Sequence, residues 1–440
     1  MAPKTSDNAA LPFGHSMIDF DVPVGWIWLL RWLLFLGPLL AVMIFGWRNR
    51  DSYPTLVGSL FAFLYGLGTI FITHQIAIYF GWWTYGGDAL MLMGLPVDIW
   101  LGGALLFGPV LYLIFPKTGP IYLALPIIIG LHGTVFSSLE PLVYAGPGWF
   151  AGVLFVFAVA HIPAIYLARW TREDRLLPLR ASLLAFGFGF LAFAVLPSVV
   201  MTAMGGSWNL GDIPIWKLLV GLPFLGVCFI MGLSAVQMFV VHGEGTPIPL
   251  DNTKRLVRTG VYAYLVNPMQ LCSALAWIVT GFIIGNIWVA SAALMAWVFV
   301  VGMVRWHHRH DLMVRFPEGW PEYRANVPEW RPRWRPWIAE SASLAYNQNN
   351  DSHQKLVGFL KSQTALGLNY VAKDTGGLSY QEPAETLKFI GLSACAKSIN
   401  HINFFWCLVG AGLLIVTLPM AYIKRIKFHL REGRNIDAPR

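Results

Sequence analysis

Nine apolar segments, each about as long as a membrane is thick, constrain the fold of this chain more than any other feature. They fall at 24–46, 54–80, 94–115, 119–140, 148–169, 179–203, 216–242, 265–285 and 287–305. A helix of about 20 apolar residues crosses the ~30 Å hydrocarbon layer of a bilayer. Only 12% of the 440 residues are charged, against ~25% in a typical soluble domain. The sequence therefore predicts an all-α polytopic membrane protein with about nine transmembrane helices.

Basic residues in the loops predict how these helices are oriented. Loops after the first, third, fifth and seventh segments carry ten basic residues: Arg48, Arg50, Lys117, Arg169, Arg172, Arg175, Arg180, Lys254, Arg255 and Arg258. The opposite side carries only Lys4 and Lys217. Cytoplasmic loops of membrane proteins are enriched in Lys and Arg, so the N-terminus is expected outside and everything after Arg305 in the cytoplasm. The same bias accounts for the net charge of +8, and no nucleic-acid partner is expected.

The chain divides by composition into three predicted domains. Residues 1–215 form a six-helix membrane domain, residues 216–337 a membrane module with an interfacial segment, and residues 338–440 a cytoplasmic domain. Within the first domain, His74, His132 and His161 lie in apolar segments. An ionisable residue inside a membrane helix is a candidate functional residue. These histidines could bind a pigment or haem, or could form hydrogen bonds between helices.

The turn between the seventh and eighth segments has the features of a ligand-binding loop. Gly260 and Pro268 bracket an aromatic turn that contains Tyr262 and Tyr264. Asn267 precedes Pro268, which disfavours helical backbone at the asparagine. Pro268 is expected to start the next helix, and nearby free N–H groups could then receive a polar or anionic ligand.

A short turn and a basic segment complete this module. A tight turn near Gly285–Asn286 should join the last two segments into an antiparallel hairpin. The following Arg305–Trp337 segment is rich in Arg and Trp. Such a segment could anchor in lipid headgroups or cover a cofactor as a lid, and both can hold together.

The order of these motifs resembles a known family. The phrase GEGTPIPLDNTKRLVRTGVYAYLVNPM (243–269) is followed by Leu312, FPEGWPEY (316–323) and VPEWRP (327–332). This pattern is similar to the signature of the isoprenylcysteine carboxyl methyltransferase and phospholipid methyltransferase family. The resemblance implies S-adenosylmethionine as cofactor, bound at the cytoplasmic face beside a groove open to membrane lipid. It implies cofactor-binding roles for five residues: Gly260, Tyr262, Tyr264, Asn267 and Pro268.

Several positions depart from the family pattern. Val261 stands where the family has Pro, Ala263 and Val266 stand where it has Arg, and His308 and Arg309 occupy the place of an adjacent Glu pair. Asp311 and His308 are the residues expected to substitute for that pair, and they are the candidate catalytic residues.

Two functions therefore remain open. One is methyl transfer to a lipid or isoprenoid-type acceptor. The other is a pseudoenzyme that serves as a structural or assembly subunit among other membrane proteins. Neighbouring helical residues point about 100° apart, so at most His307 with His310 or Asp311 could share a face. No distant Cys or His completes a ligand set, and the cluster His307, His308, His310 and Asp311 is not expected to bind a metal.

The C-terminal domain is predicted to be small and α/β. Ser341–Leu356 is a predicted polar linker, residues 355–374 are predicted to form a helix and then a strand, and residues 385–406 a second helix. This order resembles the thioredoxin-like DCC family, but Asn350 and His353 stand roughly where its C-x-x-C cysteines would lie. Because redox exchange needs a thiolate pair, a degenerate, redox-inactive domain is predicted. Residues 404–422 could form a tenth span, but an apolar helix packed in this domain or lying on the membrane is preferred.

Overall fold

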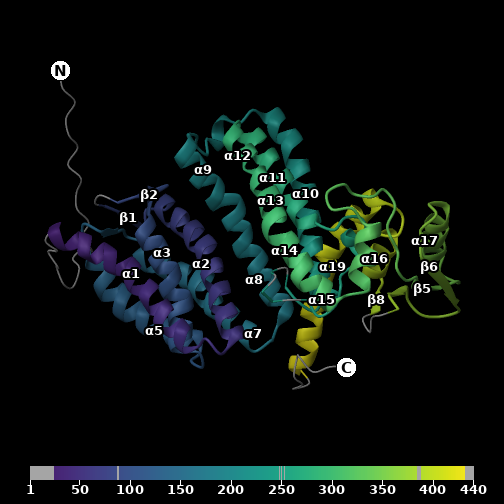
Figure 1. Cartoon of the computed structure of the whole chain (residues 1–440), viewed down its shortest axis with the longest axis horizontal. Coiled ribbons are helices and arrows are strands. Elements are labelled where there is room, and N and C mark those ends of the chain that lie inside the picture. The colour runs from purple at the N-terminus through teal and green to yellow at the C-terminus, as the bar shows by residue number, and fades with distance from the viewer. Residues whose placement is uncertain are drawn as a thin grey trace. The chain divides into compact units, whose positions relative to one another are not determined.

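The computed structural model describes residues 24–86, 89–246, 248, 250–251, 253–383 and 388–431. Contacts between Cα atoms group them into two compact units. The first comprises 1–174 and 186–202, and the second comprises 175–185 and 203–440. Figure 1 shows a chain built mostly of helices, with a small sheet in its C-terminal part.

Each of the predicted apolar segments is helical. Among the described residues, seven helices are long and apolar enough to cross a membrane, and the predicted segments 119–140 and 265–285 form the shorter apolar helices Pro120–Val135 and Pro268–Ile284. The last predicted span continues as one helical run, Ile287–Arg315. These helices are compatible with a multi-pass membrane protein.

The first unit is a helical bundle in which α-helices are interrupted by wider turns. Its α-helices are α1 (Val24–Arg48), α2 (Tyr53–Tyr79), α3 (Val97–Leu105), α4 (Leu111–Ile114), α5 (Pro120–Pro126), α6 (Trp149–Val156), α7 (Ile162–Arg172), α8 (Leu177–Phe190, shared with the second unit) and α9 (Leu196–Met204). Among the described residues of this unit, π-helical segments connect or extend them: η1 (Leu106–Val110), η2 (Ile127–Val135), η4 (Phe157–His161) and η5 (Leu191–Val195). Such wide turns are rare in α-helices and occur often at functional sites.

Two short antiparallel ribbons lie at the ends of these helices. Strand β1 (Trp83–Tyr85) pairs with β4 (Val143–Ala145), and β2 (Met91–Leu92) pairs with β3 (Leu95–Pro96). The ribbon β1–β4 is tied to the bundle by Arg31 of α1, which forms an ion pair of 3.0 Å with Asp98 and donates to the Gly86 carbonyl at 2.8 Å. This pair fixes where the ribbon closes the bundle.

The second unit begins with α10 (Ile215–Val241), which packs against α11 (Pro268–Ile284). Gly285 ends α11 in the left-handed region, at φ 70°, and the Asn286 side chain accepts hydrogen bonds from the N–H groups of Trp288 and Val289. This end cap and start cap produce the predicted hairpin turn. A Cβ on Gly281 would lie 2.4 Å from the Ala290 nitrogen, so the two hairpin helices approach closely because that residue is glycine.

The second arm of the hairpin is one interrupted helical run. It comprises α12 (Ile287–Ser291), α13 (Ala293–Phe299), η8 (Val300–Val304), α14 (Arg305–His307), η9 (His308–Leu312) and α15 (Met313–Arg315), and α16 (Gly319–Asn326) follows it. Figure 1 shows α13 and α14 running beside α10 and α11.

The C-terminal region contains a four-stranded sheet in the order β6-β5-β7-β8. Its elements are β5 (Ala342–Asn347), α17 (Asp351–Ser362), β6 (Leu368–Lys373), β7 (Ser379–Gln381), β8 (Lys388–Ile390), α18 (Leu392–Ile399) and α19 (Phe404–Arg431). Strands β5 and β6 are parallel and are joined through α17, whereas β7 is antiparallel to both β5 and β8. Helix α19 packs against α10 and α18.

Two secondary-structure predictions for this region were wrong. The predicted linker Ser341–Leu356 contains the central strand β5 and the start of α17, because Ala342 and Leu344 alternate with polar residues and are buried at 1% and 0% exposure. The second predicted helix, 385–406, contains strand β8 before α18 begins, because Phe389 buries its ring beneath Tyr380 of the adjacent strand. The first part of that prediction, residues 385–387, lies outside the described residues.

Candidate functional site

A cavity in the second unit lies where the family-like motifs meet. It contains about 880 Å³ of space free of atoms, part of it open to solvent. Its walls come from the end of α10, the loop and turn at 246–267, the beginning of α11, the helical run from α13 to α15, and α16. Among the predicted site residues, Tyr262, Asn267 and His308 line this cavity.

Asn267 and Tyr262 bring polar groups without partners to the cavity wall. Asn267 is the residue before the first turn of α11, with φ −116° and ψ 58°, and Pro268 takes the first helical position as predicted. Its side chain is 3% exposed, and its Nδ2 atom has no hydrogen-bond partner among the described residues. The buried Tyr262 hydroxyl also lacks one. Leaving such groups unpaired costs about 1–3 kcal/mol each, so the site is suited to a ligand that accepts hydrogen bonds.

Tyr262 remains a hydroxyl donor at physiological pH. Burial raises the pKa of its phenol well above the ordinary value, and the nearby Tyr323 phenol adds to the shift. The Tyr323 hydroxyl in turn donates to the Tyr262 carbonyl at 2.8 Å. This bond holds the aromatic turn against α16.

Helix α16 forms part of the cavity wall, and the segment after it packs on the aromatic turn. Trp320 and Tyr323 of α16 line the cavity. The segment that follows is joined to the turn by backbone hydrogen bonds: Val266 N–H donates to the Pro328 carbonyl at 3.0 Å, and Trp337 N–H donates to the Ala263 carbonyl at 2.9 Å. The Arg305–Trp337 segment is therefore part of the packed site.

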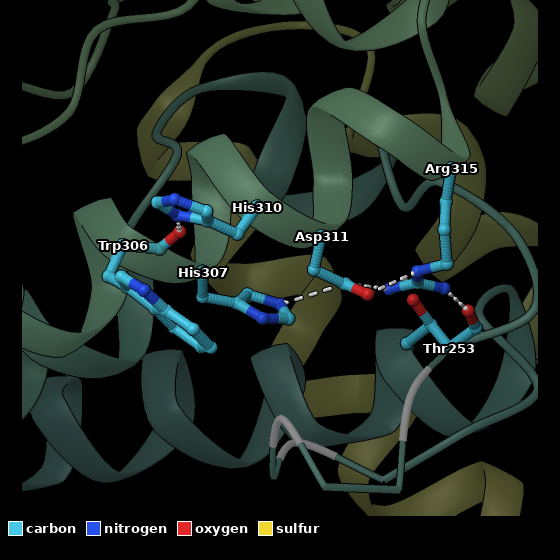
Figure 2. Close-up of polar contacts among 6 residues, drawn as sticks. All are labelled: Thr253, Trp306, His307, His310, Asp311 and Arg315. Carbon is cyan, nitrogen blue, oxygen red and sulfur yellow. Dashed lines mark hydrogen bonds and ion pairs between the residues drawn. The ribbon is translucent and has the colours of Figure 1, made fainter.

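His308 and His310, on the helical run from α14 to α15, point in different directions. The ring centroid of His308 lies 4.6 Å from that of Trp320. His310 turns away, with Nδ1 2.9 Å from the Trp306 carbonyl and its ring stacked on Trp306 (Figure 2). Among the described residues no group of three or more His, Cys, Asp or Glu side chains could hold a metal ion.

Asp311 is engaged by two neighbours one helical turn away on either side. Arg315 donates to both carboxylate oxygens, and His307 Nε2 lies 3.4 Å from Oδ2 (Figure 2). Arg315 also donates to the Thr253 carbonyl, which ties the helical run to the loop. His307 and Arg315 line the cavity, and Asp311 stands behind them.

The other predicted cofactor residues lie elsewhere. The Tyr264 hydroxyl donates to the Asn400 carbonyl at 2.7 Å, and its ring packs on Phe404 of α19. Gly260, at φ +60°, makes the turn possible and lines a separate cavity of about 640 Å³ toward the C-terminal region. Pro268 is buried as the start of α11. One turn therefore presents Tyr262 to the first cavity and Tyr264 to the C-terminal helices.

A buried ionic cluster beside the second cavity was not predicted from the sequence. Lys397 of α18 contacts Glu382 with an Nζ–Oε1 distance of 2.6 Å, and Nζ lies 2.9 Å from Nε2 of His242. His242 Nδ1 lies 3.5 Å from Glu382 Oε2. An ammonium group only donates, so Nε2 of His242 accepts and Nδ1 carries the hydrogen toward the carboxylate. The available signal was that Lys397 is the one charged residue in a helix of small and apolar residues, LSACAKSI.

The charge state of this cluster depends on its packing. Burial opposes ionisation of Glu382, but Lys397 and His242 outweigh burial, and the pKa of Glu382 falls from 4.5 to about 2. His401 lies nearby, with Nε2 2.8 Å from the Tyr380 hydroxyl and Nδ1 2.7 Å from the Leu366 carbonyl. Burial lowers the pKa of His401 below its usual value of 6.5.

Acid should therefore destabilise the C-terminal region in two steps. Below pH 6.5 the unfolded chain protonates His401 more readily than the folded chain does, so stability falls. Below pH 4.5 the lowered pKa of Glu382 causes a second loss, about 3 kcal/mol once the pH is well below 2, of which about 2 kcal/mol has developed by pH 3. Calorimetry of the purified protein in detergent from pH 7 to pH 3 measures both steps. A Glu382→Gln variant should lack the second, and an unchanged second step in that variant would contradict the assignment.

Comparisons with known proteins found no match: no family model, no curated protein and no solved structure is similar to this chain.

Proposed function

We propose that this chain is an integral membrane protein that binds S-adenosylmethionine in the Tyr262–Asn267–His308 cavity and transfers its methyl group to a lipid or isoprenoid-type acceptor. The observation that carries the proposal is that these three residues line one cavity, although His308 lies about 45 positions after Tyr262 in the sequence. Two polar groups in it, the Tyr262 hydroxyl and Asn267 Nδ2, have no partner among the described residues. The motif resemblance had assigned the same three residues to one site. Loop charges support a cytoplasmic position for this cavity.

The residues present fit the chemical groups of such a cofactor. Nδ2 of Asn267 and the Tyr262 hydroxyl are free to donate to the oxygens of its amino-acid or ribose parts. The faces of Trp320 and Tyr323 suit a sulfonium cation. When bound, the cofactor supplies an activated methyl group on sulfur. The chain's own residues then contribute orientation and exclusion of water, with His308 at the wall and Asp311 holding His307 and Arg315 in place.

The same cavity also gives the observation that favours the alternative. Among its described lining residues there is no carboxylate, and Asp311 is already engaged by Arg315 and His307. A site that lost its acidic pair can retain its packing without retaining its chemistry. The alternative proposal is a pseudoenzyme that serves as a structural or assembly subunit of a membrane complex.

The C-terminal region belongs to this proposal as a degenerate thioredoxin-like domain. A parallel β5–α17–β6 unit, followed by the antiparallel strands β7 and β8 and by α18, supports that interpretation. Asn350 caps α17 by accepting from the His353 N–H at 3.1 Å, and His353 Nδ1 accepts from the Asn347 N–H at 3.2 Å. Asn350 thus caps α17, and the His353 side chain joins the first turn of that helix to the end of β5.

Titration calorimetry with S-adenosylmethionine tests the proposal. The wild-type protein in detergent should bind with micromolar affinity, and Asn267→Ala should weaken binding by about tenfold, since one hydrogen bond in a buried site is lost. Asn326→Ala is the matched control, because that exposed side chain of α16 lies away from the cavity and donates to the Glu322 carbonyl at 2.9 Å. It should bind like the wild type.

Two outcomes would count against the methyltransferase proposal. Absence of binding at saturating cofactor would overturn it, and co-purification with other membrane chains in mild detergent would then support the subunit alternative. Binding that is equally weakened by Asn326→Ala and Asn267→Ala would show that the cavity is not the binding site.

A further inference from the structure

The first unit contains a cavity of its own, on which three histidines of its apolar segments converge. His74, His132 and His161 all line it, and it contains about 810 Å³ of space free of atoms, part of it open to solvent. Its other walls are apolar and aromatic, from α2, α3, α6, the π-helical segments η1, η2 and η4, and the ribbon β1–β4. No Asp, Glu, Lys or Arg is among its described lining residues, so a ligand that enters it is uncharged.

The three histidines have different environments. His74 is satisfied, because Nδ1 accepts from Trp83 Nε1 at 3.1 Å and lies 2.6 Å from the Tyr85 hydroxyl. These contacts hold the ribbon over the cavity. His132, in contrast, has neither ring nitrogen paired among the described residues. A buried imidazole without partners is costly, which points to a ligand that supplies one.

His132 and His161 are held on either side of the same two phenyl rings. Phe107 lies 6.0 Å from the His132 ring and 4.2 Å from the His161 ring, and Phe157 lies 5.5 Å and 4.8 Å from them. Trp149 lies 6.0 Å from His132 and donates from Nε1 to the His132 carbonyl at 2.9 Å. Both histidine rings thus lie among aromatic side chains, an arrangement suited to a flat ring.

Backbone geometry singles out the same residues independently. Phe107 belongs to η1, His132 to η2, and Phe157 and His161 to η4. Three wide helical turns from three parts of the sequence therefore meet at one cavity. Such turns place side chains where a regular α-helix would not, and they are frequent at functional sites.

We propose that this cavity binds a neutral, lipid-soluble ligand with a flat ring and carbonyl oxygens, the chemistry of an isoprenoid quinone. An imidazole N–H of His132 donates to a ring oxygen, and the aromatic side chains stack on the ring. A pure hydrocarbon would leave His132 unpaired. Haem fits less well, because its propionates are anionic and no cationic side chain is among the described lining residues. The site lies in the first unit and does not depend on the methyl-transfer proposal.

The ligand class is tested by titrating the purified full chain in detergent with decylubiquinone and following quenching of tryptophan fluorescence, since Trp83 and Trp149 line the cavity. Saturable quenching is expected. His132→Leu should weaken it about tenfold through loss of the hydrogen bond, and His132→Gln, which keeps a donor, should lose less. Val153→Phe fills the cavity, which Val153 lines, and should abolish the quenching.

Control variants and ligands decide between the outcomes. His310→Phe, on the second unit, should bind as the wild type does, and each variant is first checked for an unchanged thermal melt. Decylbenzene, which lacks ring oxygens, should bind at least tenfold more weakly than decylubiquinone. Equal affinity for both ligands, or a His132→Leu variant that melts and binds like the wild type, would overturn the proposal. Calorimetry with S-adenosylmethionine on the same His132→Leu protein should be unaffected.

Discussion

Glu382→Gln will lower the free energy of unfolding of the C-terminal region by about 3–5 kcal/mol, because it leaves the ammonium group of Lys397 buried without a counter-charge. Lys397 is 1% exposed and Glu382 8% exposed, so water cannot replace the missing carboxylate. Chemical denaturation in detergent, with limited proteolysis of the C-terminal region as the probe, measures the change.

An exposed ion pair provides the matched comparison. Glu340 lies 3.8 Å from Arg258, with 54% of its side chain exposed. Glu340→Gln removes the same charge by the same substitution, and should cost less than about 1 kcal/mol because such pairs are well solvated. Similar losses in the two variants would mean that Glu382 is not held in a buried ionic cluster.

Gly102→Ala will destabilise the first unit, whereas Gly103→Ala will not. A Cβ on Gly102 would lie 2.0 Å from the Leu34 carbonyl oxygen, so α1 and α3 could not keep their separation. Forcing atoms into a packed interface costs about 1–3 kcal/mol. The adjacent Gly103 has no atom within 4 Å of its added Cβ, and alanine there gains up to about 1 kcal/mol of helix propensity.

The melting temperatures of the two variants are measured by thermal denaturation in detergent. Gly102→Ala should melt several degrees below the wild type, and Gly103→Ala at or above it. Because the two substitutions are chemically identical and adjacent, a general effect on helix stability or expression would move both alike. Equal melting temperatures would show that α1 does not pack on α3 at Leu34.

Helices of this protein could be predicted because their signal is local. Each apolar segment is bounded by Pro, Gly or charged residues, and residues such as Gly285 and Asn286 have roles that follow from their own backbone preferences. Strand β5 was missed because its alternation is short: only Ala342 and Leu344 are buried, and they lie among Ser and Asn residues. Its hydrogen-bonded partners β6 and β7 are distant in the sequence, so the residues of β5 and their immediate neighbours do not indicate the pairing.

The candidate site was predictable to the extent that a motif order was preserved. That order placed Tyr262, Asn267 and His308 together, and these three do share a cavity. It could not show that Tyr264 faces the other way, since that depends on Asn400 and Phe404, which lie more than a hundred residues later. The cluster of His242, Glu382 and Lys397 gave only one local signal, the lone charge of Lys397 in the helix LSACAKSI, and its partners could not be predicted because they lie in distant segments.

The aromatic turn that contains Tyr262 and Tyr264 contacts a different part of the second unit on each of its two sides. Tyr262 borders the cavity that it shares with Asn267 and His308, and Tyr264, two residues on, donates to the carbonyl of Asn400 at the end of α18. A displacement of the turn is therefore felt on both faces. Suppose that binding of a partner reorders α18 and changes the affinity of the cavity for its ligand by some factor. Thermodynamic reciprocity then requires the ligand to change the affinity of the protein for that partner by the same factor. The turn would then couple the two sites, and the state of the C-terminal region would change with occupancy of the cavity without contact to its ligand.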